Sequence, residues 1–151
     1  AAAACELLLG RTVAAERLAR MAAAASPQSP APHVLLAQVA LDRGDARRAL
    51  ALAGGALDAS ALDPPALTVR ARALEALGRN LEAERAYRAA IDAGPDLVTP
   101  RLALARLLIK RNEMVEAAAI ATALVREDPT LAEARGILLT LAQAAPRASL
   151  P

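Results

Sequence analysis

The sequence has very few of the side chains that catalysis and metal binding require. Its 151 residues include one His, one Cys and one Tyr, and neither Trp nor Phe. A zinc site, a Cys–His nucleophile pair and a disulfide framework therefore lack their side chains, and so does stacking of nucleic-acid bases on aromatic rings. No Gly-rich phosphate loop or Ser/His/Asp set is present either. We expect a chain with no enzyme activity, no cofactor and no metal.

The chain also lacks an excess of charge of one sign. It has 18 Lys and Arg residues and 16 Asp and Glu residues, which gives a net charge of +2. This balance does not favour nucleic acid as a partner, because binding to polyanions needs clustered positive charge. The 56% hydrophobic content indicates an ordered domain. Lys110 is the only Lys, a bias towards Arg that we take as a sign of a GC-rich bacterial genome.

No transmembrane segment is expected. The longest uncharged stretch, residues 21–41, contains three prolines. It is therefore predicted to be two helix ends joined by a loop. At the N-terminus, four Ala residues before Cys5 resemble the cleavage site of a bacterial lipoprotein, so lipid anchoring through Cys5 is a minority alternative to a thiol within a helix. The missing initiator Met suggests a fragment or processed form, and the compartment stays open between cytoplasm and periplasm.

A period of 34 residues organises the chain. Residues able to adopt the left-handed conformation that ends a helix recur at this interval, namely Gly10, Gly44, Gly78 and Asn112. Two further series keep the same spacing: Ala15, Ala49, Ala83 and Ala117, and Pro27, Pro95 and Pro129, with Ala61 where the missing Pro would stand. The small residues Ala37, Ala71 and Ala105 follow the same step. A fixed period of this length predicts an array of helical repeats.

The segment from Ala73 to Pro95 carries the closest match to a known family. It places a turn glycine at Gly78, a small residue at Ala83, an aromatic residue at Tyr87 and a closing proline at Pro95. This pattern resembles the tetratricopeptide repeat (TPR), and the resemblance covers nearly the whole chain. It implies a right-handed all-α solenoid of antiparallel helix pairs, and protein partners bound along an inner wall formed by the first helix of each pair.

The chain departs from the family in its aromatic positions. The aromatic residues of the first helices are replaced by His33, Leu67 and Arg101, and Ala53 and Ala121 replace the aromatic that Tyr87 retains. We therefore expect modest stability that depends on a few large side chains, because Ala buries little apolar surface. These are Leu36, Leu74, Tyr87, Leu104, Leu108 and Leu124.

The period predicts about nine helices in a single array over residues 1–144. A partial repeat, 1–29, would hold the end of one helix (1–9) and its partner (12–25), with Gly10 in the turn between them. Complete repeats would follow at 30–63, 64–97 and 98–131, pairing helices 31–43 with 46–59, 64–77 with 80–93, and 98–111 with 114–127. A capping helix is expected at 130–144 and a frayed tail at 145–151. Asp63 before Pro64, and Thr130 with Glu133, are N-cap signals. The missing Pro near residue 61 suggests an irregular loop or a longer helix before Pro64.

The period also predicts which side chains share the inner wall. The candidate partner-binding residues are Gln38, Asp42, Thr68, Arg72, Glu75, Leu102, Arg106, Ile109 and Lys110. Among them, Arg72, Arg106 and Lys110 would form a basic strip between aliphatic positions, suited to an extended or helical segment with carboxylates. The alternative is a solvated face in which Arg72 pairs with Glu75 on its own helix. The Lys and Asn set that the family uses to hold chaperone C-termini is missing, so chaperone binding is not inferred.

Three functions remain open at this point. The leading hypothesis is a non-catalytic protein–protein interaction scaffold that binds a protein or peptide, acidic in character, as part of a larger bacterial protein or complex. The alternative is a structural subunit that docks through its end or convex faces to copies of itself or to a neighbour, in one version as an envelope-associated lipoprotein. A third possibility is a regulatory segment of a catalytic domain encoded elsewhere in the gene.

Overall fold

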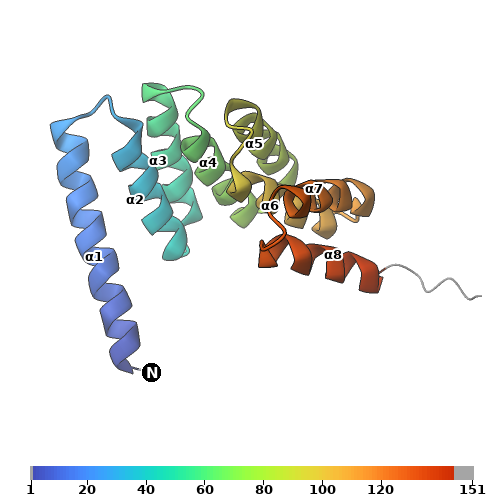
Figure 1. Ribbon diagram of the computed structural model, residues 1–151. Helices are drawn as coiled ribbons and strands as arrows, with labels where there is room; N and C mark the ends of the chain where they lie inside the picture. The colour runs from blue at the N-terminus through green and yellow to red at the C-terminus, as the bar shows by residue number, and fades with distance from the viewer. Residues whose placement is uncertain (1, 145–151) are drawn as a thin grey trace, which may run out of the picture. The chain divides into compact units, whose positions relative to one another are not determined.

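The computed structural model describes the backbone of residues 2–144 and the side chains of residues 13–144. This part of the chain forms eight α-helices and no strands (Figure 1). The helices are α1 (Ala2–Ala25), α2 (Pro30–Asp42), α3 (Ala46–Ala59), α4 (Pro64–Ala76), α5 (Asn80–Ala93), α6 (Val98–Lys110), α7 (Met114–Glu127) and α8 (Ala132–Ala144). The predicted tail, 145–151, lies outside the described residues. None of the helices described is long and apolar enough to span a membrane.

The predicted turns at Gly44, Gly78 and Asn112 are confirmed as equivalent bends. Their φ angles are 78°, 75° and 64°, and these residues separate α2 from α3, α4 from α5, and α6 from α7. The residue after each bend donates its N–H to a carbonyl five residues earlier: Asp45 to Ala40, Arg79 to Leu74, and Glu113 to Leu108, each at 2.9 Å. These bonds satisfy carbonyl groups that the helix end leaves without a partner. The 34-residue period therefore marks a repeated helical hairpin.

The prediction of a turn at Gly10 is wrong. The helix α1 runs without interruption from Ala2 to Ala25, and for this reason the described chain holds eight helices where about nine were predicted. A glycine permits a left-handed turn but does not require one, and its cost within a helix is only about 1 kcal/mol relative to Ala. Gly10 therefore keeps the period of the turn residues while lying inside a helix.

The loop before Pro64 is also regular, contrary to expectation. The helix α3 ends at Ala59, and residues 60–63 connect it to α4, as four-residue linkers do before α2, α6 and α8. Asp63 caps α4 as predicted, because its Oδ2 accepts from the N–H of Ala66 at 2.9 Å. A carboxylate at the N-cap thus ends the loop at the same point where the other linkers end. The loop therefore has the same length as the other linkers although Ala61 stands in place of the periodic proline.

The capping box predicted at Thr130 and Glu133 does not form. The backbone N–H and the hydroxyl of Thr130 both donate to Asp128 Oδ1, at 2.8 and 2.6 Å, and these bonds lower the pKa of the Asp128 carboxyl. The side chain of Asp128 therefore orders the loop before α8 by a local turn. Glu133 is left available for a different partner.

The chain divides into two compact units, Ala1–Pro95 and Asp96–Pro151. In the first unit α1 packs on α2, and α2, α3 and α4 lie side by side (Figure 1). Its core includes small residues where helices cross: Ala37 and Ala53 pack with Val69, and Ala40 and Ala49 pack with Ala73. The alanine side chains at these crossings let neighbouring helix axes approach closely.

In the second unit α7 packs against both α6 and α8, and α6 also contacts α8. Leu102, Ala105, Ala121, Leu124, Ala134 and Ile137 form its buried cluster. All six large side chains on which stability was predicted to depend are buried in their respective units. Where the family has a first-helix aromatic, Arg101 instead extends from α6 to α7 and donates two hydrogen bonds to Glu127, at 2.5 and 2.8 Å.

The buried carboxylate of Glu16 connects α1 to neighbouring parts of the first unit by ion pairs. Glu16 on α1 forms ion pairs with Arg20 on its own helix, with Arg43 after α2, and with Arg48 on α3. Burial raises the pKa of the Glu16 carboxyl, but the hydrogen bond from Arg43 and the charges of the three arginines outweigh burial, so the pKa is lowered overall. Sequence patterning did not indicate this cluster, because its members come from three separate parts of the chain.

The Glu16 cluster predicts a specific dependence of stability on pH. Because the carboxyl's pKa is lower in the folded state than in the unfolded state, Glu16 stabilises the fold above the unfolded-state pKa, and this contribution disappears as the pH falls through the folded-state pKa. Glu16→Gln should therefore lower the melting temperature at neutral pH and converge with the wild type in acid. Thermal unfolding between neutral pH and about pH 3 measures this. A difference between the two proteins that stays constant with pH would refute the role assigned to the ionised carboxylate.

Candidate partner-binding site

In the first unit, the predicted residues Asp42, Gln38 and Arg72 form a hydrogen-bonded row across two first helices. The amide of Gln38 donates from Nε2 to Asp42 Oδ1 at 2.7 Å, and its Oε1 accepts from the Arg72 guanidinium. Gln38 and Asp42 lie on α2 and Arg72 lies on α4. The row is therefore a polar strip that crosses the α2–α4 contact.

The other two predicted residues of this unit are engaged with their own repeat. Thr68 is buried, and its hydroxyl donates to the carbonyl of Pro64 at 2.8 Å. Glu75 is half-buried and accepts from the hydroxyl of Tyr87 at 3.1 Å. Thr68 therefore offers little surface to a partner, whereas Glu75 is positioned by the aromatic side chain of the second helix.

Next to the polar row lies an apolar hollow of about 320 Å³ between α2 and α4. It is lined by Ala31, Val34, Leu35, Gln38, Asp63, Pro65 and Val69. Leu35 remains 43% exposed at its edge. Gln38 thus belongs both to the hollow and to the row that ends on Arg72, so apolar and charged contacts are available side by side.

In the second unit, the predicted residues Arg106, Ile109 and Lys110 line a larger hollow between α6 and α8. Its volume is about 530 Å³, and Glu133, Gly136, Ile137 and Thr140 complete the lining. Arg106 Nη2 forms an ion pair with Glu133 Oε2 at 2.9 Å, and both side chains are more than half exposed. Leu102 lies within the core cluster and does not line this hollow.

The predicted basic strip draws on both units. Arg72 belongs to the first unit, whereas Arg106 and Lys110 belong to the second. Each unit therefore contributes a first-helix surface that combines an Arg with apolar side chains. Continuity of the three cations into one strip stays a prediction.

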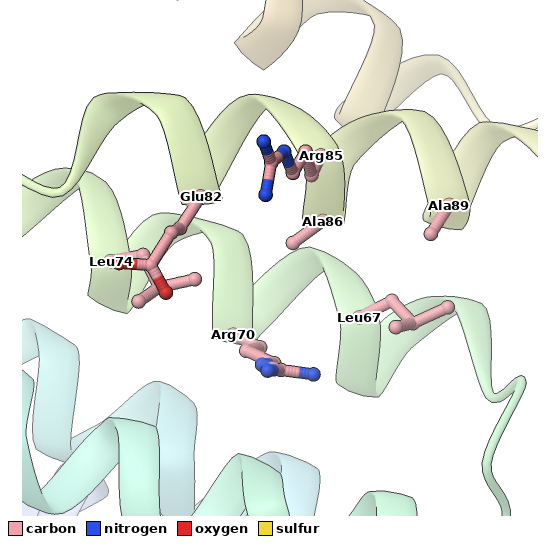
Figure 2. Close-up of a pocket in the computed structure, with 7 residues that line it drawn as sticks. All are labelled: Leu67, Arg70, Leu74, Glu82, Arg85, Ala86 and Ala89. Atoms are coloured by element: carbon pink, nitrogen blue, oxygen red, sulfur yellow. The ribbon is translucent and has the colours of Figure 1, made fainter.

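Sequence reasoning missed a third hollow, between α4 and α5. Figure 2 shows Arg70 from α4 and Glu82 and Arg85 from α5 around a floor of Leu67, Leu74 and alanine side chains, and the volume is about 270 Å³. Arg70 occupies the place that buried Leu36 and Leu104 take one repeat away in either direction, and it is exposed. That interruption of an apolar series at 34-residue spacing is the signal that could have revealed the hollow.

The charges around this third hollow are partly neutralised. Arg79 donates two hydrogen bonds of 2.7 Å to Glu82, and this lowers the pKa of the Glu82 carboxyl, against the opposing effect of burial and with smaller contributions from the charges of Arg79, Arg70 and Arg85. Glu82 is therefore an ionised member of an exposed ion pair. This arrangement is typical of a solvated helix surface.

We find no candidate metal site among the residues whose side chains are described. No group of three or more His, Cys, Asp or Glu residues there is arranged to hold a metal ion. Cys5 lies in α1, and its side chain falls outside the described residues.

Helical hairpins repeated every 34 residues, with first-helix surfaces of this kind, define a helical-repeat protein. A family model described as "Tetratricopeptide repeat" matches residues 34–98 and 68–132. The chain therefore belongs to the tetratricopeptide repeat family, whose fold is a protein–protein interaction scaffold and whose members are generally non-catalytic. A comparison with curated protein sequences found no match.

Solved structures share this fold at low sequence identity. A thermophilic TPR protein from Thermus thermophilus is 23% identical, with a TM-score of 0.76 over 92% of this chain and 75% of its own. The first TPR of Spaghetti (RPAP3), bound to the HSP90 peptide SRMEEVD, is 19% identical, with a TM-score of 0.72 over 78% of this chain and 93% of its own. YrrB, a TPR protein with an unusual peptide-binding site, is 20% identical, with a TM-score of 0.72 over 84% of this chain and 66% of its own. These similarities concern the fold.

Proposed function

We propose that this chain is a non-catalytic scaffold that binds an acidic peptide or helix on the surfaces of its first helices. The observation that carries the proposal is the hollow between α6 and α8, where Arg106 and Lys110 stand beside the apolar side chains of Ile109 and Ile137. An amphipathic segment presents the complementary set of groups. Its aliphatic side chains would fill the hollow, and its carboxylates would accept hydrogen bonds from Arg106.

The ion pair between Arg106 and Glu133 places a carboxylate on the guanidinium, in the position that the carboxylate of an acidic partner would occupy. Both side chains are more than half exposed, so the pair contributes little to folding and its exchange for another carboxylate costs little. A partner carboxylate would take the place of Glu133 on the guanidinium. A basic partner would instead be repelled by Arg106 and Lys110.

In the first unit the same chemistry is offered by Arg72, Gln38 and Asp42 beside the α2–α4 hollow. Gln38 bridges the cation and the carboxylate, so Arg72 is held in place before a partner arrives. This preorganisation lowers the entropy lost on binding. The peptide-bound TPR structure and the peptide-binding site of YrrB support the peptide as the class of ligand, since both have this fold.

Peptide selection with charge-reversal variants tests this function. A display library of random peptides is selected on the wild-type chain, and the affinity of the enriched peptides is measured for Arg72→Glu, Arg106→Glu and the double variant. We expect acidic, aliphatic-containing peptides to be enriched. The affinity of each peptide should fall by about tenfold in the variant of the surface that binds it, Arg72→Glu for the first unit or Arg106→Glu for the second, the effect of losing one charge-assisted contact.

Arg47→Glu serves as the matched control, because Arg47 is an exposed arginine in the first turn of the second helix α3. Its affinity for the selected peptides should equal that of the wild type. Enrichment of basic peptides, or equal losses in Arg47→Glu and Arg72→Glu, would place the binding surface elsewhere.

A further inference from the structure

The hollow between α4 and α5 carries charged side chains where the neighbouring repeats have apolar or small ones. Arg70 stands where both neighbouring repeats have a buried leucine. Arg85 stands where they have alanine, at Ala51 and Ala119. The two departures occur in the same repeat, 64–97, and both arginines line the same hollow. The charge is therefore particular to this hairpin and is not a property of the repeated pattern.

A small residue opens this hollow. Ala86 lies in its floor, whereas the neighbouring repeats have the larger side chains of Leu52 and Ile120 at the equivalent position. Both of these are half-buried and pack against core clusters. The repeat that lacks an aliphatic side chain here is thus the one that has gained two arginines. The open volume, about 270 Å³, lies below the range of about 300–1,000 Å³ that is usual for small-molecule pockets, and it suits individual side chains of a partner.

The two arginines have no carboxylate partner in the structure. Among the described residues, the guanidinium groups of Arg70 and Arg85 form no hydrogen bond or ion pair, and both side chains are exposed. Glu82, the acidic residue of the hollow, already accepts two hydrogen bonds of 2.7 Å from Arg79. Figure 2 shows Arg70 and Arg85 with Ala86 between them in that view. The hollow therefore combines an excess of positive charge with an apolar floor, which favours an acidic ligand.

This hollow lies on a different face of α4 from the surface that includes Arg72. Arg70 and Arg72 are two residues apart, and successive residues of an α-helix are rotated by about 100°, so their side chains leave α4 in nearly opposite directions. Arg72 donates to Gln38 across the α2–α4 contact, whereas Arg70 lines the hollow with α5. The two surfaces can therefore be tested separately.

We propose that the α4–α5 hollow is a second binding site, which takes an acidic residue of a partner protein together with an adjacent aliphatic residue. The partner's carboxylate would accept hydrogen bonds from Arg70 and Arg85. The aliphatic side chain would cover the floor formed by Leu67, Leu74 and the alanines. A free phosphate would satisfy the arginines but would leave that floor in contact with water. Complementarity of both charge and apolar surface thus favours a peptide segment.

Peptide selection on a variant without the first-helix cations tests this second site. A random-peptide display library is selected on Arg72→Gln/Arg106→Gln, and each enriched peptide is mapped by NMR chemical-shift perturbation. We expect acidic, aliphatic-containing peptides that perturb Leu74, Ala86 and Ala89. The Kd of these peptides should rise about tenfold when Arg70→Glu or Arg85→Glu is added to the same background.

Two further variants separate shape from charge. Ala86→Leu fills the hollow with the side chain that Leu52 places at the equivalent position and keeps both arginines, so peptide binding should be lost while the helical circular dichroism is retained. Arg135→Glu is the matched control for charge reversal, because Arg135 is exposed on α8 and lines none of the three hollows described. Its Kd should equal that of the background.

Three results would overturn the proposal. The first is that no selected peptide perturbs the residues of the hollow. The second is that Ala86→Leu binds the selected peptides as tightly as the background does. The third is that inorganic phosphate, titrated alone, perturbs Ala86 and Ala89 with the same affinity as the peptides, because the site would then be one for small anions. A failure of peptide binding by the first helices would leave these outcomes unchanged, since Arg72 and Arg106 are already substituted.

Discussion

Tyr87→Ala should destabilise the protein by about 3–5 kcal/mol, the largest loss that we expect from truncating one side chain of its core. Tyr87 is the only aromatic residue of the chain and is fully buried on α5. Its equivalents Ala53 and Ala121 are methyl-sized, so at this position the 64–97 repeat buries a large side chain where the neighbouring repeats bury a methyl group. Chemical denaturation followed by far-ultraviolet circular dichroism measures the loss.

Tyr87→Phe separates the packing of the ring from its hydrogen bond to Glu75. Because Glu75 is only half-buried and water replaces the lost donor, we expect a cost of about 1 kcal/mol. If Tyr87→Phe were as destabilising as Tyr87→Ala, the hydrogen bond to Glu75, and not the packing of the ring, would be the main contribution of Tyr87 to stability. A small effect in both variants would contradict the central position of Tyr87 in the packing.

Ala49→Leu should destabilise the first unit by about 1–3 kcal/mol, although it adds apolar surface. Ala49 is completely buried at a helix crossing, in a cluster with Ala40 and Ala73. The larger side chain at this point would force α3 away from α2 and α4. The denaturation midpoint measures the effect.

Ala51→Leu is the matched control on the same helix. Ala51 is exposed, and Leu and Ala have similar helix propensities, so this variant should change stability by less than about 0.5 kcal/mol. Equal effects at the two positions would show that the crossing tolerates larger side chains. The size limit at these alanines would then have no part in fixing the helix spacing.

The repeat architecture was predictable because it depends on backbone conformation and side-chain size at fixed intervals. Gly44, Gly78 and Asn112 reverse the chain, and the alanines 34 residues apart are buried at crossings. Gly10 shows the limit of the same reasoning. It keeps the period but lies within α1, since the conformational freedom of a glycine becomes a turn only where surrounding packing favours one.

The candidate site was predictable at the level of helix faces but not of side-chain partners. The 34-residue period aligned Gln38 with Arg72, and the structure joins them by a hydrogen bond. The same period gave no sign that Arg106 would pair with Glu133, because that pair spans 27 residues. Such contacts depend on rotamers and on the separation of neighbouring helices, neither of which is encoded by sequence spacing alone.

The most direct test of the central claim is to map the binding of a selected acidic peptide by NMR chemical-shift perturbation on the 151-residue chain. The proposed function predicts perturbations at residues of the first helices, at Gln38 and Arg72 on α2 and α4, or at Arg106 and Ile109 on α6 with their neighbours on α8. Perturbations confined to α3, α5 and α7 would contradict it, because the peptide would then be bound by second helices.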